Sequence, residues 1–317
     1  MVRVAVRRAL AEAAVPPGTP LLVACSGGAD SMALAAAAAF HRDWPVSAAV
    51  VDHGLQDGSA AHAARTAALL TERLAVPAKV LTVRVGGPGG MEAAARRARY
   101  PALRSALPGP DAAVLLGHTL DDQAETVLLG LGRGSGGRSL AGMRTWDRPW
   151  LRPLLGVRRT TTRAVCATLG LPVWDDPHNT EPRFTRVRLR TEVLPLLEDV
   201  LAGGVAEALA RTSAQLREDG EALDEWAALA REQAEEPDPL PGTALRAKVL
   251  VGHPAAVRRR VLRAWLTDNG VPELTDAQLR RSDDLVANWR GQGGIALPGG
   301  LALSRDHGRL VLAKPVE

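Results

Sequence analysis

Cysteine is scarce in this 317-residue chain, which carries only Cys25 and Cys166 and no CxxC pair. Their separation argues against a zinc site, a disulfide framework or a sulfur-relay enzyme, and favours two free thiols. Long apolar runs are also missing, since none reaches the length of about 18 residues that a transmembrane helix needs. The apolar stretch Met32–Phe40 is short and lacks the flanks of a signal peptide. We therefore expect a cytoplasmic protein with no membrane segment.

Lysine and aromatic residues are scarce too. Only three of the 39 basic residues are lysine, and aromatics make up 3% of the chain, which limits how far RNA bases could stack on it. The net charge is +8 over residues 1–195, −9 over 196–238 and +5 over 239–317. Two basic blocks around an acidic one suit two surfaces that contact a polyanion, but ordinary solvated faces give the same pattern. Charge alone leaves both interpretations open.

The first half of the chain alternates short apolar runs with helical patterns. Such alternation predicts a parallel sheet with helices on both faces, and ligands bind such sheets at the carboxyl ends of the strands. The expected strands are Pro20–Cys25, Val46–Val51, Ala78–Val85 and Ala112–Leu116, and the expected helices are Ser31–Phe40, Ala60–Leu74, Met91–Leu107 and Leu120–Leu131.

The second half predicts a different organisation. Glycine and serine over Gly132–Gly137 predict a mobile loop, and an increasingly acidic helical pattern covers Leu189–Ala234. Glu235–Pro241 is typical of a linker. Beyond it we expect two helices and a tail of short strands, namely Ala255–Asn269, Thr275–Trp289 and Gly294–Ala313. The chain thus divides into residues 1–197, an acidic helical connector over 198–240, and a small α+β domain over 241–317.

The strongest motif follows the first expected strand and opens a helix. Small residues let the backbone approach an anion, several N–H groups converge on it, and the helix N-terminus adds positive potential. An aspartate beside phosphate suggests a Mg²⁺ ligand or an amide contact. A serine-capped helix start is the simpler alternative. The motif consists of Ser26, Gly27, Gly28, Ala29, Asp30 and Ser31.

Polar residues also follow the second and fourth expected strands. Asp52 and His53 end the second, where a helix cap and a surface histidine are the alternative. After the fourth come His118, Asp121, Asp122 and Glu125, with the three acids on the first turns of a helix. Acids there stabilise the helix dipole, but clustered carboxylates also hold Mg²⁺ or recognise an ammonium group. His118 could orient a phosphate or shuttle a proton.

Two arginine groups complete the candidate residues. Glu92, Arg96 and Arg99 share one helix, and the first two form an i,i+4 pair whose simpler explanation is a surface salt bridge. Arg186 and Arg190 share a face of a later helix. Two guanidinium groups there could clamp phosphate or stabilise charge that develops during phosphoryl transfer.

Together these motifs resemble the tRNA(Ile)-lysidine synthetases of the PP-loop ATP pyrophosphatase superfamily. The likeness spans about residues 21 to 198, and a looser one covers the tail. It rests on SGGADS, VDHGL, ExxxRxxRY, LGHTLDDQAET, GRGSGGRSLAGM, RPLL, and WDDPHNTEPRFTRVRLR before LPLLE. Val187 stands where the family usually has Asn, and Thr119 where it often has His.

The resemblance implies a Rossmann-like PP-loop domain and a two-step reaction. ATP and Mg²⁺ activate carbon 2 of the wobble cytidine of tRNA(Ile) with a CAU anticodon, and free L-lysine then displaces AMP. This change converts the tRNA from methionine to isoleucine identity. Residues 26–31 would hold pyrophosphate with Mg²⁺ on Asp30. The resemblance also implies a tRNA-binding C-terminal domain. We further expect that the chain forms a homodimer.

The implied roles divide the candidate residues into two sets. Catalysis would fall to Asp52, His118, Asp122, Arg186 and Arg190. Substrate binding would fall to Asp52, His53, Glu92, Arg96, Arg99, Asp121, Asp122 and Glu125. A different PP-loop enzyme, such as a tRNA thiolase or an amide-forming synthetase, is one alternative. A non-catalytic nucleotide- or RNA-binding protein on the same fold is the other.

Overall fold

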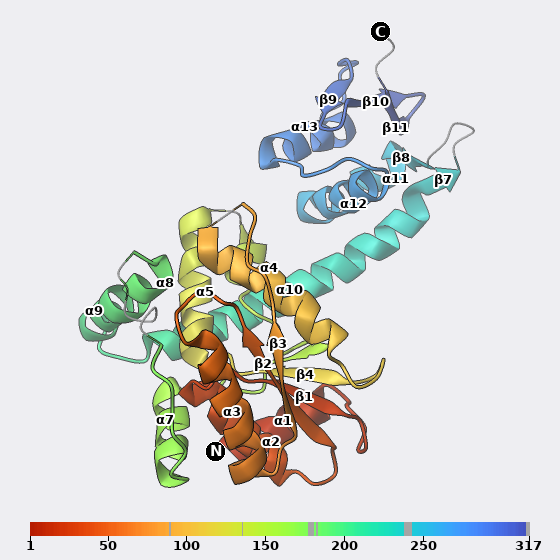
Figure 1. Cartoon of the computed structure of the whole chain (residues 1–317). Helices are drawn as coiled ribbons and strands as arrows, with labels where there is room; N and C mark the ends of the chain where they lie inside the picture. Colours follow the sequence, from red (N-terminus) through yellow and green to blue (C-terminus); the bar gives the residue numbers. More distant parts are fainter. Residues whose placement is uncertain (89, 135, 177–180, 182, 238–242, 315–317) are drawn as a thin grey trace. The chain divides into compact units, whose positions relative to one another are not determined.

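The computed structural model describes residues 1–88, 90–134, 136–176, 181, 183–237 and 243–314. The chain forms two compact units, Met1–Gln215 and Leu216–Glu317 (Figure 1). The expected division at residues 197 and 240 stays a prediction. Among the described residues, no helix has both the length and the apolar character needed to cross a bilayer.

The first unit is built on a six-stranded sheet in the order β3-β2-β1-β4-β6-β5. All neighbours pair in parallel except β5 and β6, which pair antiparallel at one edge. The predicted parallel sheet is therefore confirmed, with an unexpected edge hairpin of two-residue strands. The strands are β1 Leu21–Ala24, β2 Val46–Asp52, β3 Ala78–Thr82, β4 Ala113–Leu116, β5 Trp146–Asp147 and β6 Trp150–Leu151.

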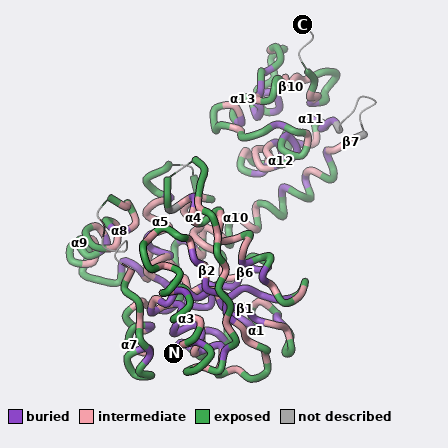
Figure 2. The backbone as a smooth tube through the Cα atoms, in the orientation of Figure 1, coloured by how far each residue is buried: buried purple, intermediate pink, exposed green. Residues whose placement is uncertain are grey.

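Alternate side chains of the strands pack on opposite faces of this sheet, as the two-residue period of a strand requires. On one face, Leu21 and Val23 of β1 pack with four helices: α1 (Val2–Glu12), α2 (Ala29–Phe40), α3 (Ser59–Leu74) and α7 (Arg159–Thr168). On the other face, Leu22 packs against α4, which spans Gly90–Ser105. Figure 2 shows the central strands as the most continuously buried part of this unit.

Two segments of the first unit differ from the predicted pattern. Helix α5 (Leu120–Arg133) extends into the segment predicted to be a mobile loop, and α6 begins at Gly137 of the same segment. Helix α5 ends there because Gly134 adopts the left-handed conformation, with φ +63°. The predicted helix Leu189–Ala234 is broken at Ala202–Gly204, where all three residues have positive φ. It is preceded by α8 (Thr185–Arg188) and comprises a π-helical turn η2 (Leu189–Val193), α9 (Leu194–Val200) and α10 (Val205–Ala234).

The second unit is a five-stranded antiparallel sheet, in the order β7-β8-β11-β10-β9, with the end of α10 and three further helices. Trp265 of α12 is fully buried in its core. The expected two helices and strand tail are confirmed, but part of the predicted linker forms β7. The elements are β7 Glu235–Pro237, β8 Thr243–Arg246, α11 Ala247–Val251, α12 Ala255–Asp268, α13 Asp276–Ala287, β9 Ile295–Leu297, β10 Leu301–Asp306 and β11 Arg309–Ala313.

Candidate active site

The site lies where the strand order reverses. The chain runs from β1 outward to β3 and then returns to the other side of β1 with β4, so the carboxyl ends of β1 and β4 flank a switch point. The two loops that leave them are in contact. A Cβ on Gly117 would lie 3.1 Å from the backbone nitrogen of Ser31, so any larger residue would have to push the two loops apart by a few tenths of an ångström. The phosphate-loop motif and the HTLDD motif are thereby brought together.

Serine hydroxyls shape the phosphate loop, residues 26–31, from within. The Ser31 hydroxyl donates to the Gly28 carbonyl at 2.9 Å and accepts from the Ser26 backbone N–H at 3.1 Å. Gly27 has a φ of +85°, which favours glycine. Gly28 caps α2, so Ala29, Asp30 and Ser31 form its first turn. This is the geometry of an anion site at a helix N-terminus, and the role of the six residues in binding phosphate stays a prediction.

One arginine joins the two motifs. The Arg159 guanidinium lies 3.2 Å from Asp30 (Nε to Oδ2), 2.6 Å from Asp122 (Nη2 to Oδ1) and 3.6 Å from Glu125 (Nη1 to Oε1). Its side chain is 19% exposed and that of Glu125 is fully buried. Thr162, one turn further along α7, donates its hydroxyl to Asp30. Helix α7 thus supplies the counter-charge for acids on both α2 and α5.

The three acids respond differently to this arginine. Burial disfavours ionisation of Asp122, but Arg159 and two hydrogen bonds from Thr119 outweigh it and lower its pKa. For Asp30 and Glu125 burial outweighs the hydrogen bonds and cations around them, so both pKa values are raised. Arg159 stays charged because the three carboxylates more than offset its burial. The cluster therefore holds closely packed negative charge that depends on arginine.

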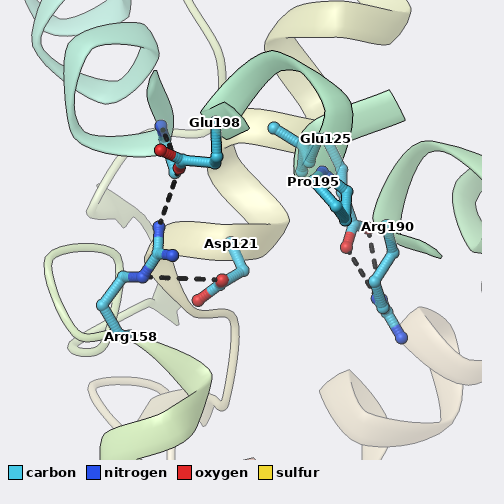
Figure 3. Close-up of a pocket in the computed structure, with 8 residues that line it drawn as sticks. Asp121, Glu125, Arg158, Arg190, Pro195 and Glu198 are labelled. Atoms are coloured by element: carbon cyan, nitrogen blue, oxygen red, sulfur yellow. Dashed lines mark hydrogen bonds and ion pairs between the residues drawn. The ribbon is translucent and has the colours of Figure 1, made fainter. Parts of the chain in front are cut away.

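A pocket of about 150 Å³ opens beside Glu125 (Figure 3). Arg190 binds both Glu125 oxygens, at 2.8 Å from Nε and 3.2 Å from Nη2, and lies 3.6 Å from Asp122. Arg186 lies 3.9 Å from Glu125. Leu194, Pro195 and Ala206 give the pocket an apolar part. Here the structure brings together the predicted residues Asp122, Glu125, Arg186 and Arg190.

The opposite wall of this pocket is a second ion network. Arg158 lies 3.7 Å from Asp121, 3.8 Å from Glu198 and 3.6 Å from Glu207. Glu198 accepts hydrogen bonds from the backbone N–H groups of Val205 and Ala206 at the start of α10, which lower its pKa. Asp121 also accepts the backbone N–H of Arg159 at 2.8 Å, so it fixes the start of α7 beside the site.

His118 lies at the end of β4 with its Nδ1 atom buried and without a hydrogen-bond partner. Burial is the largest cause that lowers its pKa, to about 3. Arg99, Arg152 and Arg96 add to that effect, whereas Asp122 opposes it. His118 is therefore neutral at pH 7 and takes up a proton only with difficulty.

The residues after β2 form a separate part of the site. The buried Asp52 carboxylate accepts the backbone N–H of Gly54 at 3.0 Å and so shapes its own turn. His53 has a lowered pKa because of burial and the nearby charge of Arg99, which Asp52 opposes. Arg96 lies over the Tyr100 ring at 4.7 Å. The Glu92 side chain lies outside the described residues, so its pairing with Arg96 stays a prediction.

Two residues that help to build the site, Arg159 and Gln123, were not among the predicted site residues. Arg159 lies in an RRTTTR stretch without a motif, and the two-residue strand β6 that leads to it shows no alternation. The side-chain amide of Gln123 accepts the backbone N–H of Met143 at 2.8 Å and donates to its carbonyl at 3.1 Å, so it holds the end of the glycine-rich loop. Its place between Asp122 and Glu125 in the DDQAET motif was the available hint. Residues 177–179 of the DDPHN motif lie outside the described part.

A bound Mg²⁺ fits the donor chemistry at Asp30 and Asp122. Within the described residues, no three His, Cys, Asp or Glu side chains form a metal-binding group. Magnesium in nucleotide sites, however, is usually held by one or two carboxylates together with substrate phosphates. Asp30 and Asp122 both lie within 3.2 Å of one guanidinium and beside the phosphate loop, which suits such an arrangement. Asp30 as a ligand stays a prediction.

Replacing Arg159 should destabilise the first unit. Arg159→Met leaves three carboxylates without their shared cation, and breaking a buried ion pair in this way costs about 3 kcal/mol. The loss at pH 7 should shrink at pH 5, because Asp30 and Glu125, with raised pKa values, then take up protons. Urea unfolding at both pH values measures this. The matched control is Arg163→Met, whose pair with Asp175 is exposed and should contribute less than about 1 kcal/mol. Equal losses for both variants would contradict the account.

His118 should not titrate near its ordinary pKa. The folded protein keeps it neutral from pH 8 to pH 5, whereas an unfolded chain binds a proton near pH 6.5. Neutral His118 therefore favours the folded state above pH 6.5, and this contribution is lost as the pH falls towards 3. The imidazole ¹⁵N shifts of His118, assigned by comparison with His118→Asn, should stay constant from pH 8 to pH 5. A midpoint near pH 6.5 would refute the buried, neutral state.

Comparison with known proteins agrees with these motifs. A family model described as the PP-loop domain matches residues 3–197, and one described as the TilS substrate binding domain matches residues 245–311. The tRNA(Ile)-lysidine synthase of Nocardia farcinica is 58% identical over 320 aligned residues, which cover 99% of this chain and 98% of the relative. That of Mycobacterium tuberculosis (strain ATCC 25618 / H37Rv) is 59% identical over 284 residues, covering 87% and 83%.

Among solved structures, the U34-tRNA thiolase NcsA from Methanococcus maripaludis is similar with a TM-score of 0.56 and 18% identity. The likeness covers 68% of this chain and 78% of the thiolase, and at that identity it shows the fold alone. The family models and the two close relatives decide the family. The chain belongs to the tRNA(Ile)-lysidine synthase family of PP-loop enzymes.

Proposed function

We propose that this chain ligates free L-lysine to carbon 2 of the wobble cytidine of tRNA(Ile) with a CAU anticodon. One observation carries the proposal: a buried carboxylate pair, Asp122 and Glu125, already holds the cationic side chain of Arg190 beside the phosphate loop. A reaction that brings a triphosphate and an ammonium group to one carbon needs both features side by side. The relatives' name, over nearly the whole chain, supports the same substrates.

The phosphate loop is suited to the first step. Its N–H groups at the start of α2 would bind the pyrophosphate that leaves when the cytidine oxygen attacks the α-phosphate of ATP. Asp30 and Asp122 would hold Mg²⁺, which supplies positive charge to the phosphate oxygens. Arg96 and Arg99 lie close enough to His118 to affect its charge, so they can balance α-phosphate or tRNA charge at the same end of the sheet.

The acid cluster is suited to the second step. A lysine ammonium group can replace the Arg190 guanidinium at Glu125, and the apolar side chains of the neighbouring pocket can contact the lysine methylenes. The attacking amine must lose a proton. A pKa of about 3 makes His118 a weak base at neutral pH, whereas the raised pKa of Glu125 makes its carboxylate the better-suited proton acceptor.

A thiolase mechanism is disfavoured by the thiols themselves. Cys25 is buried next to Ser31, and burial is the main cause that raises its pKa. Burial likewise raises the pKa of Cys166, to about 11. A sulfur carrier needs an accessible thiolate, which neither residue provides at neutral pH.

Incubation with ATP, Mg²⁺, radiolabelled lysine and a CAU-anticodon tRNA(Ile) transcript tests the proposal. Nucleoside analysis should find lysine on the wobble cytidine, dependent on ATP and lost in Asp30→Ala. The exposed Asp111→Ala is the matched control and should retain activity. Pyrophosphate release without lysine incorporation would keep the ATP chemistry and reject lysine as the nucleophile. The expected homodimer and cytoplasmic location stay predictions.

A further inference from the structure

The peptide groups of the phosphate loop are held from outside by two residues that the reaction itself does not use. His62 of α3 bonds the Ser26 carbonyl through Nε2 at 3.0 Å. The backbone N–H of Trp174 donates to the Gly27 carbonyl at 2.9 Å. The two consecutive carbonyls that precede Gly27 and Gly28 are therefore both tied down, from different parts of the chain.

The geometry of the peptide bond turns this into a constraint on the anion site. In a trans peptide the C=O and the N–H of one unit point in opposite directions. Holding the Ser26 carbonyl therefore aims the Gly27 N–H away from His62, and holding the Gly27 carbonyl aims the Gly28 N–H away from Trp174. The Gly28 N–H indeed lies on the side of the Ser26 hydroxyl, 3.5 Å away. These are the N–H groups that an anion would meet.

The two holding residues also support each other. The His62 and Trp174 rings lie 4.4 Å apart, tilted by 33°. The imidazole lies so close to Gly27 that an added Cβ would come within 2.8 Å of Cε1. Gln56 donates to Asp176 at 3.0 Å and so holds the segment that carries Trp174. Because a carbonyl only accepts, His62 must carry a proton on Nε2 to make its bond.

We propose that His62 and Trp174 form a clamp that positions the phosphate loop for the pyrophosphate part of ATP. The clamp is defined by the His62–Ser26 bond, the Trp174–Gly27 bond and the contact between the two rings. Both residues act through the loop and touch no reacting atom. The inference rests on the proposed function only in assigning the loop to pyrophosphate.

Three substitutions at His62 separate the donor from the ring. His62→Phe keeps a ring against Trp174 but loses the donor, His62→Gln keeps an N–H donor, and His62→Ala loses both. Since one hydrogen bond contributes about 0.5–1.5 kcal/mol, His62→Phe should raise KM for ATP about two- to tenfold. It should leave KM for lysine unchanged. His62→Gln should stay within about twofold of the wild type.

His41→Phe is the matched control. His41 also bonds a backbone carbonyl through Nε2, that of Arg3 at 2.9 Å, and also lies beside a tryptophan, Trp44. It lies at the opposite end of α2 from the phosphate loop, so its substitution should leave KM for ATP unchanged. A merely structural role for His62 would lower the melting temperature without this selective change in KM.

Calorimetry with inorganic pyrophosphate and the full chain separates the clamp from the proposed function. Weaker pyrophosphate binding by His62→Phe, in the same proportion as the rise in KM for ATP, supports the clamp even if no lysine is ligated. Unchanged pyrophosphate binding overturns the clamp even if lysine is ligated. If His62→Phe fails to fold, Gln56→Leu removes the support of the Trp174 segment instead. It should weaken pyrophosphate binding, and wild-type affinity would then overturn the proposal.

Discussion

The charge balance around Arg159 is the interaction on which the site depends. Strands β1 and β4 are neighbours, so the helices that follow them begin side by side and bring Asp30, Asp122 and Glu125 into one small volume. Three carboxylates packed so closely, one of them fully buried, would repel one another and lose their hydration. A single guanidinium that contacts all three makes the arrangement stable. The same contacts hold α7 against the two loops, so the ion pairs that neutralise the acids also stabilise the fold of the site.

This balance would also let one site serve two substrates of opposite charge, as the proposed function requires. The phosphate loop offers backbone N–H groups and a helix N-terminus, whereas the cluster beside it offers carboxylates that are already bonded to Arg159 and Arg190. An incoming anion can draw arginine towards itself, and an incoming ammonium group can take the place that arginine leaves. Neither exchange leaves a buried charge without a partner, which is the costly outcome. The clamp at His62 and Trp174 keeps the loop fixed while these charges are exchanged.

The sequence predicted those parts of the site that lie in continuous motifs directly after strands. The phosphate loop and the HTLDDQAET segment were both placed correctly at strand ends, because short apolar runs and glycine turns are local signals. Arg159 and His62 were missed because each reaches the site from a helix that is distant in sequence. Arg159 is 37 residues from Asp122, and His62 is 36 residues from Ser26. Strands β5 and β6, of two residues each, are too short for any alternation to show. The break at Ala202–Gly204 was missed because one acidic helical pattern continues across it.

Under the proposed function, the phosphate loop carries out adenylation and Glu125 of the acid cluster binds lysine in the second step. This division is tested most directly with α-³²P-labelled ATP and tRNA(Ile) in the absence of lysine, by measuring how much labelled AMP becomes attached to the tRNA. Glu125→Gln should accumulate adenylated tRNA to the wild-type level and then fail to convert it when lysine is added. Ser26→Ala should instead reduce adenylation itself. If Glu125→Gln lost adenylation as severely as Ser26→Ala, Glu125 would belong to the first step, and the assignment of lysine to it would be wrong.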